Sequence, residues 1–185
     1  MIQTIENQMK RMAAFASVLL MATAEALAQE NQAQPTRRIV VSIPDRKLAL
    51  LDSGKVVKIY QTAVGAPKSP SPTGSFKIIR RVVDPTWSSN GKVAGPGKSN
   101  PVGTRWIGLS IKGYGIHGTN APSSIGRNAS HGCVRMRNRD VEELYTMVSV
   151  GDSVDLYGER TPELDRIFGE PAVAAVAADA VAAQQ

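Results

Sequence analysis

The sequence has few of the groups that build disulfides and metal sites. Its 185 residues hold one cysteine, Cys133, and two histidines, His117 and His131. One cysteine cannot close a disulfide within the chain. There is also no Cys-x-x-Cys pair and no second ligand cluster, so the sequence disfavours a structural zinc site. We therefore expect a domain that folds without disulfides and holds no metal.

Aromatic residues and long apolar runs are also scarce. Phe, Trp and Tyr make up 5% of the chain and do not alternate with basic residues, so the base-stacking pattern of a single-stranded nucleic-acid binder is missing. Beyond the N-terminus, no run approaches the roughly 20 apolar residues that a membrane helix needs. We expect no nucleic-acid partner and no transmembrane segment in the mature chain.

The first thirty residues follow the three-part pattern of a secretory signal. A polar start is followed by an apolar run over residues 12–24 and by Ala-Leu-Ala at residues 26–28, which a signal peptidase accepts. We expect residues 1–28 to be a signal peptide and residues 29–37 a linker. The alternative is a buried helix or an uncleaved anchor. Export would place the mature protein in the periplasm or cell envelope.

The chain is basic, with a formal net charge of +6. A basic exported protein is attracted to anionic polymers. Cell-wall peptides, teichoic acids and anionic lipid head groups all have this character.

Alternating apolar residues predict a mainly β domain over residues 38–158. Strands are expected at residues 38–43, 47–51, 56–64, 76–83, 106–111, 115–118 and 153–157. The first three resemble an antiparallel meander. Residues 159–185 form a C-terminal extension that includes an Ala-rich stretch, which we expect to be flexible beyond a short helix at residues 161–168.

Helical spacing appears after the cysteine. Val141, Leu144, Tyr145 and Val148 would form one buried stripe. Asn138 is the expected N-cap, and Gly151 the expected end of the helix.

Residues 84–103 form a long Gly- and Pro-rich segment that carries Trp87. Loops of this length inside a compact domain are usually functional, so the segment predicts a lid over a site. The alternative is an unstructured insertion.

The candidate chemistry centres on residues 130–136, which read Ser-His-Gly-Cys-Val-Arg-Met. An unpaired thiol in an oxidising compartment needs a reason, and nucleophilic catalysis is one, because an imidazole can convert the thiol to the reactive thiolate. His117 is the favoured base, and His131 is the alternative. An inert buried cysteine or a zinc site of His117, Cys133 and His131 are the other interpretations.

The residues around the thiol have candidate roles. The backbone N–H groups of Gly132 and Cys133 could form an oxyanion site, because glycine permits close approach. Arg135 could bind a substrate carboxylate, or it could be a solvated charge or a partner of Asp140. Ser130 could fix the turn by a local hydrogen bond, or it could be an ordinary turn residue.

These motifs resemble a known family. Residues 116–119 (Ile-His-Gly-Thr) followed by residues 130–136 are similar to the signature of the L,D-transpeptidase catalytic domain. Further agreement lies in residues 64–65, 71–76, 84–87 and 100–103. The resemblance covers about residues 38–157.

The resemblance implies a fold and an activity. The fold is a β-sandwich of mixed sheets with one helix after the cysteine motif. Family members are exported bacterial enzymes that act on peptidoglycan stem peptides, use no cofactor and are targets of carbapenems. Cys133 would attack the carbonyl of the third stem residue and release D-alanine. An amine of a second stem would then resolve the thioester, giving a 3→3 crosslink that contributes to cell wall organisation.

The resemblance also assigns roles to single residues. It makes His117 the base, steadied by the carbonyl of Gly118, and places His131, Gly132 and Cys133 along the oxyanion site. It leaves the acceptor open. Water would make the protein an L,D-carboxypeptidase, and an amine of an outer-membrane protein would make it a protein-anchoring enzyme. A non-catalytic basic wall-binding module is the interpretation from another class.

Overall fold

The computed structural model describes residues 37–169. The predicted signal peptide at 1–28, all but the last residue of the linker at 29–37, and the Ala-rich part of the extension lie outside these residues. The strands are β1 (Arg37–Ser42), β2 (Lys47–Asp52), β3 (Lys55–Gln61), β4 (Val64–Gly65), β5 (Gly74–Val83), β6 (Trp87–Ser89), β7 (Lys92–Ala94), β8 (Arg105–Leu109), β9 (Gly115–His117), β10 (Asn128–Ser130), β11 (Val134–Arg135) and β12 (Ser153–Tyr157). The helices are the 3-10 turn η1 (Pro122–Ser124), α2 (Asn138–Met147) and α3 (Pro162–Phe168).

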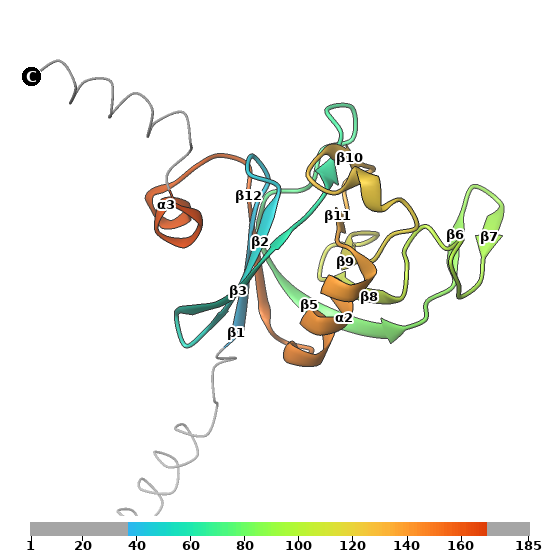
Figure 1. Cartoon of the computed structure of the whole chain (residues 1–185), viewed down its shortest axis with the longest axis horizontal. Helices are drawn as coiled ribbons and strands as arrows, with labels where there is room; N and C mark the ends of the chain where they lie inside the picture. Colours follow the sequence, from blue (N-terminus) through green and yellow to red (C-terminus); the bar gives the residue numbers. More distant parts are fainter. Residues whose placement is uncertain (1–36, 170–185) are drawn as a thin grey trace, which may run out of the picture. The chain divides into compact units, whose positions relative to one another are not determined.

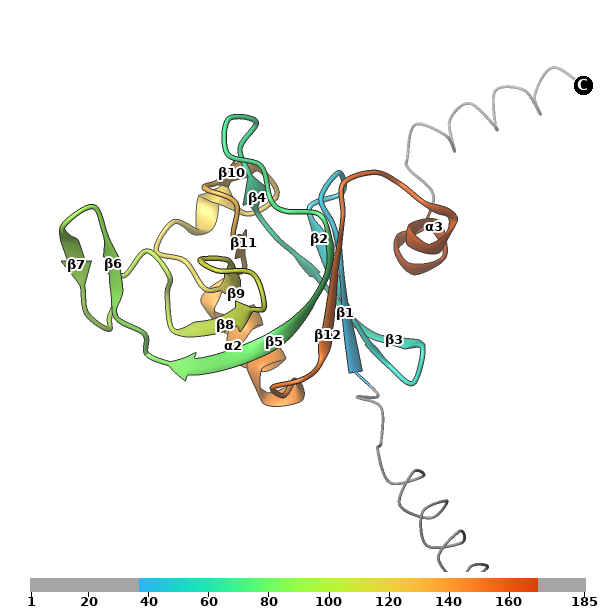
Figure 2. The same cartoon turned by 180° about the vertical axis from the view of Figure 1, so that it is seen from behind.

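One mixed sheet organises the domain. Its eight strands run in the order β11-β9-β8-β5-β12-β1-β2-β3. β1 pairs antiparallel with β2, as in a meander, but parallel with β12. The long strand β5 pairs with β12 through its first residues and with β8 through its last, with a register shift after Ile78. The sheet therefore curls around this strand (Figures 1 and 2), and the mainly β fold predicted from the sequence is confirmed.

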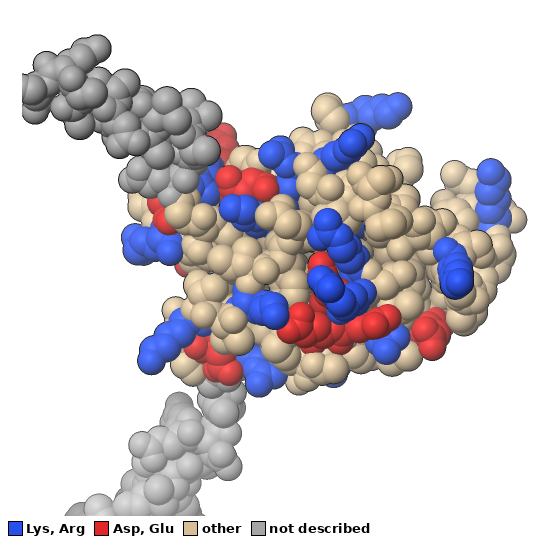
Figure 3. All heavy atoms as spheres, viewed as in Figure 1, with Lys and Arg blue, Asp and Glu red and all other residues tan. Residues whose placement is uncertain are grey.

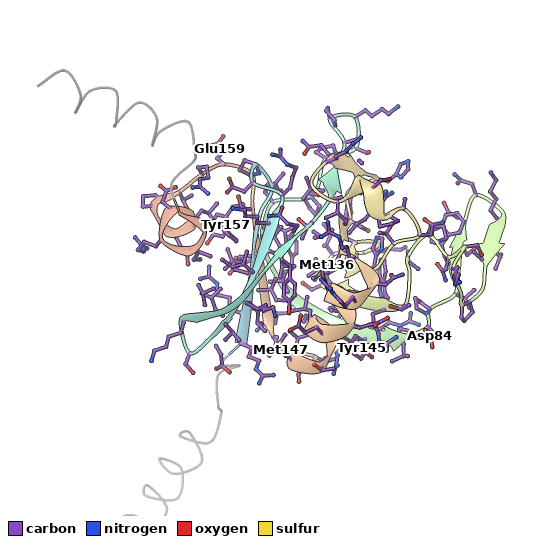
Figure 4. All side chains as sticks on the ribbon, viewed as in Figure 1. Asp84, Met136, Tyr145, Met147, Tyr157 and Glu159 are labelled. Atoms are coloured by element: carbon purple, nitrogen blue, oxygen red, sulfur yellow. The ribbon has the colours of Figure 1, made fainter. Side chains whose placement is uncertain are left out.

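The main core lies inside the curl. Ile39 and Val41 of β1, Ile107 of β8 and Leu144 of α2 are fully buried in one cluster, so both halves of the sheet and the helix share one interior. α2 packs against β8 and β9. Met136, labelled in Figure 4, lies between this helix and the strands. The helix thereby supports the strands that carry both motif segments.

A smaller core lies on the opposite face of the sheet. Val40 and Leu51 point away from the main core and pack against Leu164 of α3. The hydroxyl of Thr161 caps α3 by accepting from the N–H of Leu164 at 3.3 Å. None of the helices within residues 37–169 has the length and apolar character needed to cross a membrane.

Charged side chains of both signs share one face of the domain. On the face seen in Figure 3, Lys and Arg side chains are interspersed with Asp and Glu. Arg38, for example, is paired with Asp155 and Glu163. The net positive charge therefore does not form one basic patch on this face.

Both ends of α2 differ from the prediction. Arg137 occupies the N-cap without a side-chain cap, because the Asn138 side chain bonds the backbone of Thr119 instead. The helix ends at Met147 rather than Gly151, since Val148 is extended and places its side chain in the core.

The expected strand at residues 56–64 also ends early. β3 stops at Gln61, and the chain continues into β4, which pairs with β10 in a separate small sheet.

Leu144→Ala should lower the free energy of unfolding by about 3 kcal/mol, because it leaves a cavity between α2 and the strands. Val150→Ala is the matched control, since Val150 is 61% exposed and should change stability by less than about 0.5 kcal/mol. Urea unfolding of both variants measures the difference. Equal losses would contradict this placement of the core.

Candidate active site

Strand pairing brings the two motif segments together. β9 and β11 run parallel, with Ile116 opposite Val134 and His117 opposite Arg135. On its other edge, Arg135 exchanges backbone hydrogen bonds with Ala63 at 2.8 and 2.9 Å. The cysteine motif is thus held between two backbone segments, and Cys133 lies at the entrance to β11.

A cavity of about 660 Å³ opens at this point. It is lined by Trp87, Ser88, Ser89, Asn90, Lys92, Pro101, Val102, Trp106, Gly113, His117, Ser130, His131, Cys133 and Arg135. Five of the seven predicted site residues therefore line one cavity, whereas Gly118 and Gly132 are not part of its lining. Within residues 37–169, no three His, Cys, Asp or Glu side chains are arranged to hold a metal ion, so the zinc interpretation finds no support there.

His117 is buried and precisely oriented. Its ring stacks on Trp106 with 5.5 Å between centroids, and its Nδ1 lies 2.5 Å from the carbonyl oxygen of Gly118. Because a carbonyl only accepts, Nδ1 carries the proton and Nε2 keeps its lone pair. Burial lowers the pKa of His117 to about 4, and Arg135 adds to this lowering, against the opposing effect of Gly118. The imidazole is therefore neutral at neutral pH.

The thiol is also neutral at rest. Burial raises the pKa of Cys133, although the backbone of Gly115 and the charge of Arg135 act in the opposite direction. The Sγ atom lies 3.6 Å from the carbonyl oxygen of Gly113. A resting thiolate–imidazolium pair does not fit these surroundings. His117 is instead suited to accept the thiol proton as a bond forms.

Ser130 and Gly132 shape the turn before the thiol. The buried Ser130 hydroxyl donates to the carbonyl of Cys133 at 2.6 Å and accepts from the N–H of Gly132 at 3.0 Å. Gly132 has φ +111°, and a Cβ there would lie 2.6 Å from Tyr114. The N–H of Gly132 is thus engaged by Ser130, so an oxyanion site in this conformation would draw on the N–H of Cys133.

Arg135 faces the cavity without an acidic partner. Asp140, its predicted alternative partner, pairs with Arg137 at 3.8 Å and Arg139 at 3.3 Å. No ion pair formed among residues 37–169 includes Arg135. Its guanidinium is available to a carboxylate ligand.

Residues 84–103 form an ordered hairpin. β6 and β7 pair and project from the sheet (Figures 1 and 2), and residues 87–90 and 92 line the cavity. The fully buried Asn100 anchors their base by donating to the carbonyls of Pro85 at 2.5 Å and Gly95 at 3.1 Å. The interpretation as an unstructured insertion is therefore wrong.

Sequence reasoning missed several side chains that support the site. Trp106 stacks on His117, Tyr114 packs against Gly132, and Asn138 reaches the backbone of Thr119. Each contact joins separate segments, and no local pattern signals such a contact. The stacking of Trp106 on His117 has one sequence signal, which is the position of Trp106 shortly before the histidine motif.

The buried neutral His117 should make stability depend on pH. Between its unfolded pKa of about 6.5 and its folded pKa of about 4, the unfolded chain binds a proton that the folded chain does not. The free energy of unfolding should therefore fall as pH falls from 7 to 4, with about 3 kcal/mol from this residue. Comparing denaturant unfolding of wild type and His117→Gln at both pH values isolates that part, because the other groups contribute equally. Parallel pH dependences in the two proteins would contradict the assignment.

Comparison with known proteins extends this description. The model of the L,D-transpeptidase catalytic domain family matches residues 36–156. YkuD of Bacillus licheniformis, which carries the name of an L,D-transpeptidase, is 42% identical over 119 residues. That match covers 64% of this chain and 64% of the relative, so the chain spans less than two thirds of the length of this relative.

Solved structures agree with the fold. The catalytic domain of the Enterococcus faecium L,D-transpeptidase superimposes with a TM-score of 0.55 at 25% identity, covering 69% of this chain and all of that domain. An L,D-transpeptidase from Mycobacterium smegmatis gives a TM-score of 0.58 at 20% identity, covering 67% of this chain and 59% of the other. With a family match over most of the described residues and the same fold in these structures, the chain belongs to the L,D-transpeptidase catalytic domain family.

Proposed function

We propose that this protein is an L,D-transpeptidase that acts on peptidoglycan tetrapeptide stems through a Cys133 thioester. The observation that carries the proposal is the sharing of one cavity by the sole cysteine and a buried, neutral histidine, in a chain of this family. A wall-binding module would have no use for a thiol and an imidazole placed in this way.

The first half-reaction follows from the orientation of His117. Sγ of Cys133 attacks the carbonyl carbon of the third stem residue, and the thiol proton passes to Nε2 of His117. The N–H of Cys133 stabilises the oxyanion that develops, since such a donor lowers the barrier by about 3 kcal/mol. The carbonyl of Gly118 stabilises the imidazolium through Nδ1–H. The amine of D-alanine then takes the proton from Nε2 and leaves, and the thioester remains on Cys133.

The second half-reaction repeats these steps with an incoming amine. His117 removes a proton from the amine as it attacks the thioester carbonyl, and it returns the proton to Sγ as the thiol leaves. The product is the 3→3 linked peptide, and the enzyme recovers its neutral pair. No step requires a metal or another cofactor.

The space beside the cavity favours a second stem as the acceptor. A neighbouring cavity of about 530 Å³ shares Trp87, Ser88, Val102 and Trp106 with the first. The second cavity adjoins the first across these side chains, so a second peptide bound there would lie beside the stem bound at Cys133. Water needs no such room, and an outer-membrane protein remains an acceptor for the product analysis to test.

The N-terminal signal pattern supports export to the periplasm, where peptidoglycan lies. The excess of positive charge would favour residence near the anionic wall.

Cys133→Ala should abolish the covalent adduct with a carbapenem, since the nucleophile is absent, and His117→Ala should slow adduct formation by about 100-fold or more. Intact-protein mass spectrometry over time measures both. Circular dichroism of the variants verifies that they fold. A carbapenem adduct that persists in Cys133→Ala would sink the proposed chemistry.

The natural reaction is tested by incubating the protein with disaccharide-tetrapeptides and separating the products. We expect dimers with 3→3 links and released D-alanine, both absent with Cys133→Ala. Tripeptides alone would assign the protein as a carboxypeptidase, and fragments linked to an added outer-membrane protein would assign it as an anchoring enzyme. If none of these products forms, the proposal that the protein is an enzyme acting on these stems is contradicted.

Arg135→Gln should lower kcat/KM for a tetrapeptide stem by about 10- to 100-fold, because a charge-assisted bond to a substrate carboxylate is lost. The control is a stem with its C-terminal carboxylate amidated, on which wild type and variant should differ little. An equal loss on both stems would mean that Arg135 does not recognise that carboxylate.

A further inference from the structure

Asn138, the first residue of α2, lies close to the proposed base without touching it. Its Oδ1 accepts a hydrogen bond from the N–H of Thr119 at 3.0 Å. That N–H and the carbonyl of Gly118 belong to the same peptide group. The oxygen of this carbonyl in turn lies 2.5 Å from Nδ1 of His117. One peptide group thus connects the Asn138 carboxamide to the imidazole.

We propose that Asn138 is a positioning residue that orients His117 through the peptide group between Gly118 and Thr119. The path runs from Oδ1 of Asn138 to the N–H of Thr119, across the peptide to the carbonyl of Gly118, and on to Nδ1–H of His117. The inference deepens the proposed function, because its kinetic consequence rests on His117 acting as the base.

The direction of each bond is fixed by chemistry. A backbone N–H can only donate, so the atom of Asn138 that faces Thr119 is the oxygen rather than the amide nitrogen. A backbone carbonyl can only accept, so the facing ring nitrogen of His117 carries hydrogen. The path therefore sets the tautomer that leaves Nε2 with its lone pair.

The carboxamide oxygen of Asn138 is closely packed against two glycines. A Cβ at Gly103 or at Gly118 would be 2.1 Å from Oδ1, so both glycines are needed to admit it. Gly103 has φ +64° and ends the segment that carries the β6–β7 hairpin. The carboxamide is thus enclosed between the base of that segment and the turn that follows His117.

Helix capping does not account for this residue. The start of α2 has no side-chain cap, and Asn138 directs its acceptor to Thr119 rather than to the N–H groups of its own helix. Because an asparagine in this region usually serves its own helix terminus, the different use indicates a role outside the helix.

The expected physical effect has two parts. Two hydrogen bonds on opposite sides of one peptide hold its plane, and each bond polarises the other in a buried setting. The Gly118 carbonyl is then held toward Nδ1 and stabilises the imidazolium that forms during attack. In a Ser-His-Asp triad a carboxylate orients the histidine and stabilises its imidazolium, whereas every group of the path here is neutral.

The charged groups near His117 do not mask the effect of a charge added at position 138. β11 contributes Arg135, the turn before β11 contributes the Cys133 thiol, and β8 contributes the uncharged ring of Trp106. Asp140, also on α2, is paired with Arg137 and Arg139, and Arg135 is the charged group that lowers the pKa of His117. A new carboxylate at position 138 would therefore act on His117 as an additional negative charge at the end of the path.

The test compares Asn138→Leu, which removes the acceptor, with Asn138→Asp, which keeps it and adds charge. Thr161→Ala is the matched control, because it removes a helix N-cap on the opposite face of the sheet. Nitrogen-15 NMR of the ring nitrogens gives the tautomer and pKa of His117, with His131→Gln to assign the two histidines. The carbapenem acylation rate is followed against pH for the same proteins.

We expect Asn138→Leu to lose the pure Nδ1–H tautomer and to acylate about 10- to 100-fold more slowly, since a small misplacement of a base costs this much. Asn138→Asp should keep the tautomer and raise the pKa of His117 by about one unit or more, moving the acid limb of the rate profile upward. Thr161→Ala should lose some stability while tautomer, pKa and rate stay unchanged.

The proposal is overturned if His117 in Asn138→Leu keeps its tautomer and the rate matches that of Thr161→Ala. If Asn138→Leu fails to fold, Asn138→Asp decides alone, and an unchanged pKa of His117 overturns the proposal. The NMR result needs no activity, so a failed path is distinguishable from a failed function. If only the path fails, His117→Ala still slows acylation. If the proposed function fails, His117→Ala leaves the acylation rate unchanged.

Discussion

The parallel pairing of β9 with β11 is the constraint on which the site depends. It sets His117 opposite Arg135 and brings Cys133 to the same cavity. Because side chains alternate along a strand, a slip of one residue would turn the thiol and the imidazole to opposite faces. The register is fixed by the N–H of Met136, which donates to the carbonyl of His117 at 2.8 Å, and by the burial of the Met136 side chain in the main core. The packing of Met136 in the core therefore also fixes the geometry of the site.

Burial decides the resting state of the reactive pair. The surroundings that lower the pKa of His117 and raise that of Cys133 disfavour both charged forms. A neutral thiol is a weak nucleophile toward oxidants, so burial also slows the oxidation of this unpaired cysteine. The same burial strengthens hydrogen bonds to charge that develops during a reaction. Protection at rest and assistance during attack thus have a common origin.

Local pattern predicted much of this structure, and tertiary contact decided the rest. The strands and α2 follow from alternation and helical spacing, and the cysteine and histidine motifs are visible as short segments. The end of α2 was wrong because Val148 enters the core, and the loop at residues 84–103 is an ordered hairpin because Asn100 bonds its base. The residues adjacent in sequence to Val148 and Asn100 do not indicate either contact. Strand boundaries shifted for the same reason, as at β3, where the chain leaves the sheet to pair with β10.

Three glycines of the site leave room for side chains from other segments. Gly103 and Gly118 admit the carboxamide of Asn138, and Gly132 admits the ring of Tyr114. In each case a side chain from another segment occupies the space where a Cβ would lie, so contacts from elsewhere in the fold hold the backbone of both motifs in place. An amide in this place orients the base without charging it, whereas a carboxylate would favour the imidazolium and, with it, a resting thiolate. A neutral support therefore agrees with a site that keeps its sulfur protonated until a substrate arrives.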